Sequence, residues 1–293
     1  MNHIKSNRLK NLSYAIRGPI FDKAQKLENE GNKIIHLNIG NPAPFGFDVQ
    51  DEIVSDMILN IRKAQGYSHH LGIMPARKAV MDYTEKIGIK NVEIPDIFIG
   101  NGVSELIGMC LQALLNEDDE VLLPSPDYPL WTTAVGLSAG KVVHYVCDEE
   151  ADWNPDVNDM RSKITSKTKA IVLINPNNPT GAVYEKEVLE GIVALAAEKN
   201  LMVFSDEIYD KILYDGNKHV PIASLSEDVF FMTFGGLSKN YLAAGFRGGW
   251  VIASGAKEKA KSYLEGINLL ASMRLCANVP AQYAIQTALE GRQ

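Results

Sequence analysis

A lysine in a glycine-rich segment near the end of the chain could act as a nucleophile toward a carbonyl compound. Ser238 and Lys239 follow Gly235-Gly236, and Arg247 comes eight residues after the lysine. A lysine amine that is desolvated beside another cation has a lowered pKa and attacks carbonyl carbons. The planar guanidinium of Arg247 suits a phosphate group. Because most lysines are solvated surface residues, Lys239 gains meaning only from the groups around it.

Two earlier segments carry an acid and a group of amides. Asp206 directly follows an apolar run at residues 201–205, and Tyr209 comes three residues later. A carboxylate at the end of a buried strand is costly unless it meets a cation or a protonated nitrogen, although capping the next turn would also explain it. In the sequence Asn-Pro-Asn-Asn-Pro-Thr-Gly at 175–181, two prolines and a glycine fix a rigid turn that can present the amide of Asn178 to a ligand.

A turn and an aromatic side chain complete the set. Residues 100–105 read Gly-Asn-Gly-Val-Ser-Glu and precede a predicted helix, whose free N–H groups at Val103 and Ser104 could bind an anion. The turn lacks the third glycine of a dinucleotide fingerprint, so it suits a single phosphate or a purely structural turn. Tyr128, in Asp-Tyr-Pro, could stack on a planar ring or, like nearby Trp131, could belong to the core.

Five of these features, the lysine, the arginine, the acid at a strand end, the glycine turn before a helix and the aromatic side chain, are together typical of a site for pyridoxal 5′-phosphate. That cofactor needs a lysine that forms a Schiff base, an acid for its ring nitrogen, a stacking aromatic group and a cup for its phosphate. Few other cofactors require all of them at one place.

The elements that must position these groups alternate along the chain. Strand-like apolar runs occupy residues 34–39, 97–99, 121–123, 141–146, 170–174, 201–205 and 230–234, and helical patterns occupy 51–62, 75–87, 104–115, 186–198 and 256–270. Such alternation predicts an α/β fold with a mostly parallel sheet flanked by helices. Ligands of such sheets bind beyond the carboxyl ends of the strands, where the segments described above begin.

Composition and charge exclude several classes of protein. The 293 residues are 46% hydrophobic and 22% charged, and 29 basic residues against 36 acidic ones give a net charge of −7. That charge disfavours nucleic acid as a partner, and no apolar run approaches membrane-spanning length. The three cysteines form no zinc-binding pattern, and with no secretory leader they favour the cytoplasm. The pair His69-His70 lacks a third metal ligand at suitable spacing, so no metal is expected.

The motifs resemble those of the class I and II aminotransferases, which have the fold of type I pyridoxal-phosphate enzymes. The resemblance rests on Asn-Asn-Pro-Thr-Gly at 177–181, Asp-Glu-Ile-Tyr at 206–209, and Ser238-Lys239 with Arg247. The segments at 38–47 and 272–280 are similar to the glutamate–pyruvate (alanine) transaminase subgroup. The resemblance implies amino transfer between an L-amino acid and a 2-oxo acid in two alternating half-reactions, with alanine, glutamate, pyruvate and 2-oxoglutarate as the substrates.

The same resemblance implies a role for each residue. Lys239 would link to the cofactor and then move the proton of the substrate Cα, Asp206 would keep the ring nitrogen protonated, and Tyr209 with Asn178 would bind the phenolic oxygen of the ring. Gly40 and Asn178 would line the pocket for the substrate carboxylate. Tyr67 would reach the phosphate in the neighbouring subunit of a homodimer. The implied cofactor-binding residues are Val103, Ser104, Tyr128, Asn178, Asp206, Tyr209, Ser238, Lys239, Arg247 and Tyr67.

The sequence departs from the family pattern in two places. Gly236 stands where many relatives carry a serine, which removes one hydroxyl from the phosphate site. The family also has a small C-terminal domain that grips the substrate carboxylate with an arginine, and we expect this domain to be absent from the chain. The expected organisation is therefore an N-terminal arm at residues 1–33, which belongs to the small domain, and a large cofactor-binding domain at 34–293.

Alternative functions remain open at this point. An aminotransferase for aromatic or branched amino acids, or a lyase of the same fold, would share every cofactor-binding residue. A fragment that binds the cofactor without turning over is a second alternative. A transcription regulator is disfavoured, because about thirty residues before the first expected strand leave little room for a helix-turn-helix domain.

Overall fold

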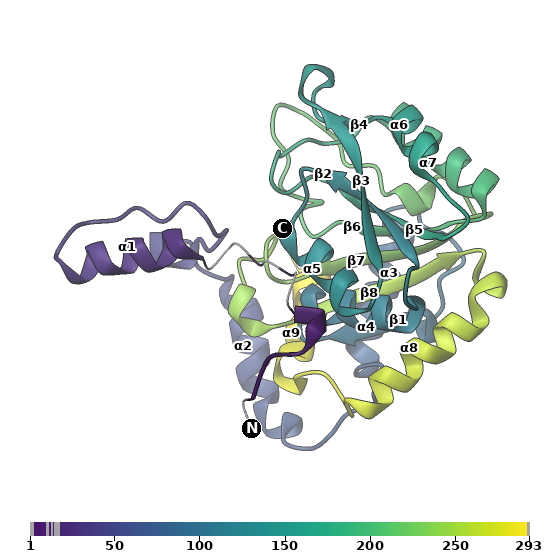
Figure 1. The fold of residues 1–293 in the computed structure, drawn as a ribbon. Helices are drawn as coiled ribbons and strands as arrows, with labels where there is room; N and C mark the ends of the chain where they lie inside the picture. The colour runs from purple at the N-terminus through teal and green to yellow at the C-terminus, as the bar shows by residue number, and fades with distance from the viewer. Residues whose placement is uncertain (1–2, 10–11, 13, 15–17, 292–293) are drawn as a thin grey trace.

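The centre of the structure is an eight-stranded sheet with the strand order β1-β8-β7-β6-β5-β2-β3-β4 (Figure 1). The computed structural model describes residues 3–9, 12, 14 and 18–291. The strands are β1 (Ile97–Gly100), β2 (Glu120–Ser125), β3 (Lys141–Asp148), β4 (Asn154–Pro155), β5 (Thr168–Ile174), β6 (Met202–Asp206), β7 (Phe230–Gly236) and β8 (Gly249–Gly255).

The middle of the sheet is parallel and its margins are antiparallel. Strands β3, β2, β5, β6 and β7 run in the same direction, whereas β8 pairs antiparallel with both β7 and β1, and β4 pairs antiparallel with β3. Because β8 is reversed, β1 points the same way as β7. The carboxyl ends of β1, β2, β5, β6 and β7 therefore lie at one edge. The prediction of a mostly parallel sheet flanked by helices is confirmed, but β8 was not foreseen.

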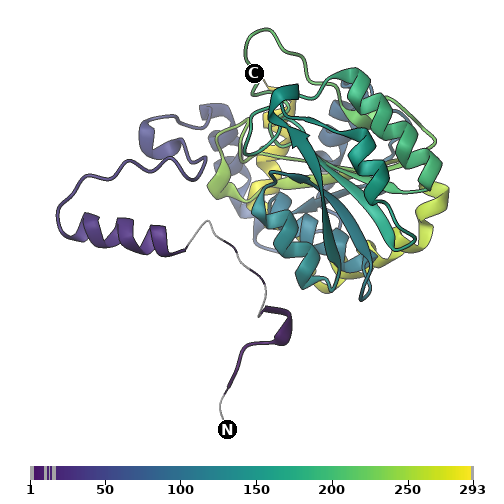
Figure 2. The same cartoon turned by 45° about the horizontal axis from the view of Figure 1, so that its top comes forward.

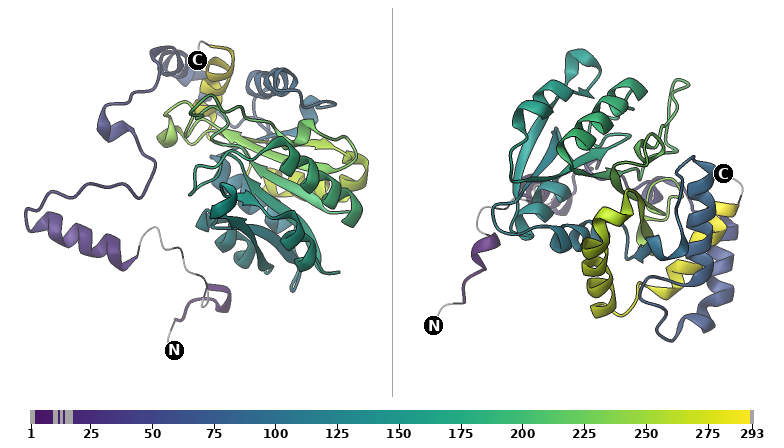
Figure 3. Two further views of the ribbon diagram at one scale, coloured as in Figure 1. Left: turned by 90° about the horizontal axis from the view of Figure 1, so that it is seen from above. Right: turned by 90° about the vertical axis from the view of Figure 1, so that its right-hand side faces the viewer.

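Helices cover both faces of the sheet, as Figures 2 and 3 show. Helices α4, α5 and α8 pack on one face through a core that includes Leu106, Trp131 and Ile267. On the other face, α7 packs against β5 and β6, α6 packs against β3, and α3 and α9 pack against β1 and β8. The helices are α1 (Pro19–Asn29), α2 (Asp51–Asn60), α3 (Met74–Lys86), α4 (Val103–Leu114), α5 (Pro129–Leu137), α6 (Val157–Lys163), α7 (Lys186–Lys199), α8 (Lys261–Met273) and α9 (Val279–Glu290).

Alternate residues of the central strands supply the two cores. In β5, Val172 belongs to the core under α4 and α5, while its neighbours Ile171 and Leu173 belong to the core under α7. A strand with both faces covered reads as a continuous apolar run, which is why β5, β6 and β7 were recognisable in the sequence. The predicted helix at 256–270 is divided in the structure into a short 3-10 helix, Lys257–Ala260, and α8.

The strand predicted at residues 34–39 is wrong. These residues form irregular chain, and the side chains of Ile35 and Leu37 are 69% and 86% exposed. An apolar run becomes a strand only where the backbone groups of a neighbouring strand can pair with it, and this segment lies outside the sheet. It follows α1, which stands away from the sheet in Figures 1 and 2 and has no buried residue.

Of the predicted N-terminal arm, residues 1–33, the structure describes residues 3–9, 12, 14 and 18–33, and the others lie outside the described residues. Among the described residues, no helix combines the length and the apolar character needed to cross a membrane.

Candidate active site

The segments that the sequence singled out meet at the edge where the parallel strands end. The turn before α4 follows β1, residues 175–181 follow β5, Tyr209 comes just after β6, and Lys239 follows β7. The first residue of β8, Gly249, begins at the same edge because it pairs with Gly236 of β7 and Gly100 of β1. The parallel direction of the strands thus brings residues that are far apart in the chain to one place.

Lys239 is half-buried and faces both an N-terminal segment and an aromatic ring. Its Nζ donates a hydrogen bond of 3.0 Å to the carbonyl oxygen of Gly40, and it lies 5.9 Å from the centre of the Tyr209 ring. Burial and then the charge of Arg247 lower the pKa of Lys239, while Asp206 opposes them in part. A larger fraction of this amine is therefore neutral, and nucleophilic, at a given pH than of a surface lysine.

Asp206 is a buried carboxylate, only 3% exposed, at the last position of β6. Its Oδ2 accepts a hydrogen bond of 3.1 Å from Nε1 of Trp131, and its Oδ1 accepts one of 3.4 Å from the backbone N–H of Ile208. Burial raises the pKa of Asp206 to about 6 in spite of these two donors. Within the described part of the chain Asp206 forms no ion pair, so a cationic ligand nitrogen would supply what this carboxylate lacks.

Aromatic and amide groups surround the lysine and the acid. Burial raises the pKa of Tyr209 and the charge of Asp206 adds to the effect, whereas a hydrogen bond with Asn178 lowers it. Tyr128, the residue before α5, is half-buried, and its hydroxyl lies 3.4 Å from that of Tyr14. Burial raises the pKa of Tyr128, and Asp206 and Tyr209 contribute to the same shift. The three side chains therefore lie within electrostatic reach of one another.

The turn before α4 has the shape of an anion site. Gly102 has a φ of +81°, and no side chain caps the N-terminus of α4, so its first N–H groups at Val103 and Ser104 are available. A Cβ on Gly249 would lie 2.8 Å from the backbone N of Val103, so only glycine allows β8 this close. Arg247 borders the turn, donating to the carbonyl oxygens of Asn101 at 3.2 Å and Ala244 at 2.8 Å.

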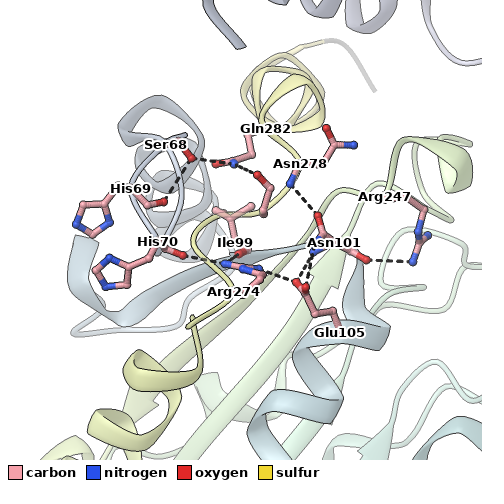
Figure 4. Close-up of polar contacts among 11 residues, drawn as sticks. Ser68, His69, His70, Ile99, Asn101, Glu105, Arg247, Arg274, Asn278 and Gln282 are labelled. Atoms are coloured by element: carbon pink, nitrogen blue, oxygen red, sulfur yellow. Dashed lines mark hydrogen bonds and ion pairs between the residues drawn. The ribbon is translucent and has the colours of Figure 1, made fainter. Parts of the chain in front are cut away.

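A polar network lies beneath this turn (Figure 4). Both oxygens of Glu105 accept hydrogen bonds from Asn101, one from its backbone N–H at 2.7 Å and one from its side chain at 2.8 Å. The guanidinium of Arg274 is 2.6 Å from Glu105, and the backbone N–H of Asn278 donates to Asn101 Oδ1 at 2.7 Å. The loop between α8 and α9 is thus attached directly to the turn.

Of the predicted site residues, Tyr67 stands apart. Its side chain is 83% exposed, and no hydrogen bond or ion pair among the described residues joins it to Lys239 or Asp206.

Ser238 is half-buried next to Lys239. His70 bonds to Asn268 at 2.8 Å, and the described residues contain no group of three His, Cys, Asp or Glu side chains arranged to hold a metal ion.

Sequence reasoning missed two features of the site. Trp131 was weighed as a core residue, and it is fully buried in the core, but it also donates to Asp206. The signal was available, because a buried indole N–H requires an acceptor. The bond between Arg274 and Glu105 joins residues 169 positions apart, and no local pattern reveals such a pair.

The polar groups gathered at this edge of the sheet fit pyridoxal 5′-phosphate. Asp206 is a buried carboxylate that forms no ion pair among the described residues, and the uncapped N-terminus of α4 and Arg247 suit a phosphate. Lys239 is near enough to Asp206 and Arg247 for their charges to shift its pKa. Val103, Ser104, Ser238 and Arg247 would hold the phosphate, and Asp206 would hold the ring nitrogen.

Comparison with known proteins identifies the family. The family model for aminotransferase class I and II matches residues 32–293. The chain is 60% identical over 289 residues to the glutamate-pyruvate aminotransferase AlaA of Escherichia coli (strain K12), covering 99% of this chain and 71% of that protein. It is 55% identical to the alanine aminotransferase of Mycobacterium tuberculosis (strain ATCC 25618 / H37Rv), with 99% and 68% covered.

Solved structures agree with this assignment. An aminotransferase from Escherichia coli superimposes with a TM-score of 0.98 at 59% identity, over 100% of this chain and 72% of that one. The alanine aminotransferase from Pyrococcus furiosus gives a TM-score of 0.95 at 39% identity, over 99% and 73%. The chain therefore belongs to the aminotransferase class I and II family, whose enzymes depend on pyridoxal 5′-phosphate.

Proposed function

We propose that this chain transfers the amino group of L-alanine to 2-oxoglutarate, which gives pyruvate and L-glutamate. The observation that carries the proposal is the position of Lys239, whose lowered pKa, neighbouring buried Asp206 and adjacent phosphate turn provide a nucleophilic amine within a cofactor site. The choice of substrates is supported by the relatives at 55% and 60% identity, which are named alanine and glutamate-pyruvate aminotransferases.

Each residue has a distinct task in this proposal. When bound, pyridoxal phosphate supplies an aldehyde that links to amines and a ring that withdraws electrons from the substrate Cα. Lys239 would hold the cofactor through Nζ and would move the proton at the substrate Cα. Asp206 holds the proton on the ring nitrogen, and Tyr209 and Asn178 bind the phenolic oxygen. Tyr128 covers a face of the ring.

The remaining predicted residues bind substrate and phosphate. Gly40 and Asn178 line the substrate carboxylate pocket, and the hydrogen bond of Gly40 with Lys239 supports the placement of Gly40. Val103, Ser104, Ser238 and Arg247 hold the phosphate. The two half-reactions alternate, so the keto acid formed from the first substrate leaves before the second substrate binds. Residues 34–293 form the large cofactor-binding domain in this proposal, and residues 1–33 form an arm.

The proposal includes a homodimer that works in the cytoplasm. The high exposure of Tyr67 leaves its side chain accessible to a second subunit, whose phosphate it reaches. The cysteines Cys110, Cys147 and Cys276 are free, which suits a compartment where thiols stay reduced.

A product assay with matched lysine variants tests this function. The purified protein with pyridoxal phosphate, L-alanine and 2-oxoglutarate should form pyruvate and glutamate in equal amounts. Lys239→Ala should lower kcat by at least about 10³-fold, because it removes both the anchor and the proton carrier. The control Lys186→Ala, at an exposed lysine on α7, should leave kcat unchanged.

Three outcomes would contradict the proposal. Faster turnover of L-tyrosine or L-leucine than of L-alanine would assign the chain to another substrate class. Release of ammonia instead of glutamate would indicate a lyase. Binding of the cofactor without any product from these amino acids would indicate a chain that binds the cofactor but does not transfer amino groups.

A further inference from the structure

A partly buried ion pair lies under the turn that we assign to the phosphate (Figure 4). Nη1 of Arg274 is 2.6 Å from Oε2 of Glu105, and the two side chains are 15% and 25% exposed. Glu105 is the third residue of α4, so its carboxylate belongs to the first turn of the helix whose N-terminus faces the proposed phosphate.

Glu105 stabilises the turn through hydrogen bonds, but its negative charge disfavours the binding of a phosphate. It accepts hydrogen bonds from the backbone and the side chain of Asn101, which fixes the turn directly before Gly102. Its negative charge, however, stands beside a site proposed for a phosphate monoester, which carries close to two negative charges at neutral pH. Like charges repel strongly where burial reduces the screening by water. An unpaired Glu105 would therefore weaken the binding of phosphate.

Arg274 is held in place to meet this charge. Its Nη2 donates to the carbonyl oxygens of His70 at 2.8 Å and of Ile99 at 3.2 Å, so its position is set by β1 and the loop before α3. Its Nε, in contrast, is buried without a hydrogen-bond partner among the described residues. Burying a guanidinium with one N–H unsatisfied carries a cost in folding free energy. A role in the proposed phosphate site would explain why this arginine is buried here despite that cost.

We propose that Arg274 is a positioning residue that neutralises Glu105, so that the turn keeps its shape and still accepts a dianionic phosphate monoester. The inference rests on the proposed function, because it assumes that the turn at 102–104 holds the phosphate of the cofactor. Arg274 is not one of the residues that we assign to the phosphate. It acts through Glu105 and is assigned no contact with the ligand.

Binding of two cofactor analogues that differ only in the phosphate tests this proposal. We would titrate the cofactor-free protein with pyridoxal phosphate and with pyridoxal, which lacks the phosphate, and follow absorbance. Arg274→Gln should raise the Kd for pyridoxal phosphate by at least about tenfold and change the Kd for pyridoxal by less than about twofold. The control Arg161→Gln, which breaks an exposed ion pair with Glu198 of 2.5 Å, should change neither Kd.

Two further variants separate charge from packing. Arg274→Lys keeps the charge and should bind pyridoxal phosphate within about threefold of wild type. In a protein that already carries Glu105→Gln, Arg274→Gln should cost less than about threefold, because no carboxylate remains to be neutralised. These two variants also provide the test if Arg274→Gln alone does not fold.

The proposal would be overturned by an equal loss of affinity for pyridoxal phosphate and pyridoxal in Arg274→Gln, which indicates general disruption of the site. A tenfold loss in Arg274→Lys, or an undiminished effect of Arg274→Gln beside Glu105→Gln, would overturn it as well. Failure of the wild-type protein to bind pyridoxal phosphate would instead refute the proposed function. Tight binding of pyridoxal phosphate by both wild type and Arg274→Gln would refute only the proposal that Arg274 neutralises Glu105.

Discussion

At the scale of single residues, the surroundings of Asp206 suit the proposed role of this acid in binding the cofactor. The carboxylate is buried, and two donors, Nε1 of Trp131 and the N–H of Ile208, partly compensate for its loss of water. These donors favour the charged form, whereas burial favours the neutral form, and the pKa of about 6 reflects the balance. In the proposed function Asp206 must be charged to hold a proton on a ring nitrogen, so we expect the hydrogen bond from Trp131 to support activity.

Replacing this tryptophan should therefore shift the pH dependence of activity. Trp131→Phe removes the N–H and preserves most of the packing. Hydrogen bonds to charged groups are worth about 1.5–3 kcal/mol, so the pKa of Asp206 should rise by about one to two units. The acidic limb of the kcat/KM profile should move to higher pH by a similar amount. Trp153→Phe, at a partly buried residue that packs against the core on the other face of the sheet, serves as control. Equal acidic limbs in Trp131→Phe and wild type would exclude this role.

At the scale of elements, the phosphate turn depends on the close approach of two chain segments. The start of β8 passes directly under the turn before α4, and Gly249 leaves no space for a side chain there. The same strand is antiparallel to β7 and β1, so the reversal of β8 in the sheet is what brings its first residue to the edge where the parallel strands end. The shape of the turn therefore depends on β1, α4 and β8 together.

A methyl group at Gly249 should displace the turn. In Gly249→Ala the added Cβ would lie 2.8 Å from backbone atoms of Gly102 and Val103, and backbone cannot move aside as a flexible side chain can. We expect a loss of about 1–3 kcal/mol in unfolding free energy and at least tenfold weaker binding of pyridoxal phosphate. Chemical denaturation and cofactor titration measure the two effects.

A second glycine provides the control for this prediction. Gly108 lies within α4, and a Cβ there meets nothing within 4 Å. Gly108→Ala should leave cofactor affinity unchanged and stabilise the protein by up to about 1 kcal/mol. Unaltered cofactor affinity in Gly249→Ala would contradict the assignment of the turn.

At the scale of the whole molecule, we expect the buried Asp206 to reduce the stability of the cofactor-free fold at neutral pH. Burial raises the pKa of Asp206 from 3.8 to about 6. The folded protein therefore binds this proton more tightly than the unfolded chain does. The contribution of Asp206 to stability is fully present below about pH 4 and is lost as the pH rises through about 6. At neutral pH the fold must keep a buried charge that its ligand is expected to neutralise.

Asp206→Asn should consequently stabilise the cofactor-free protein at neutral pH. The amide can accept the hydrogen bond from Trp131 without carrying a charge. The shift of about two units corresponds to up to about 3 kcal/mol, which should appear above pH 6 and vanish below pH 4. Urea denaturation from pH 4 to 8 measures this difference, with Asp22→Asn on the exposed face of α1 as control. A variant that is less stable than wild type at pH 7.5 would refute the argument.

The sequence by itself determined the class of fold and the family, and it predicted the residues of the site. The continuous apolar runs of β5, β6 and β7 are visible because strands covered on both faces need no polar residues. Lys239, Asp206 and the turn at 100–105 could be singled out because each lies at or just beyond the carboxyl end of an apolar run, and parallel strands end at one edge. The failed strand at residues 34–39 shows the limit of this reasoning, since apolar character does not provide a pairing partner.

Only the tertiary structure decided which distant residues support that site. The reversed strand β8 places Gly249 under the turn, Trp131 reaches Asp206 from α5, and Arg274 reaches Glu105 from the loop after α8. Each of these contacts depends on packing across the sheet, where residues 75 to 169 positions apart become neighbours. Local sequence encodes periodicity, turns and buried ends of strands, but it does not encode distances between segments, because those are set by how the layers pack.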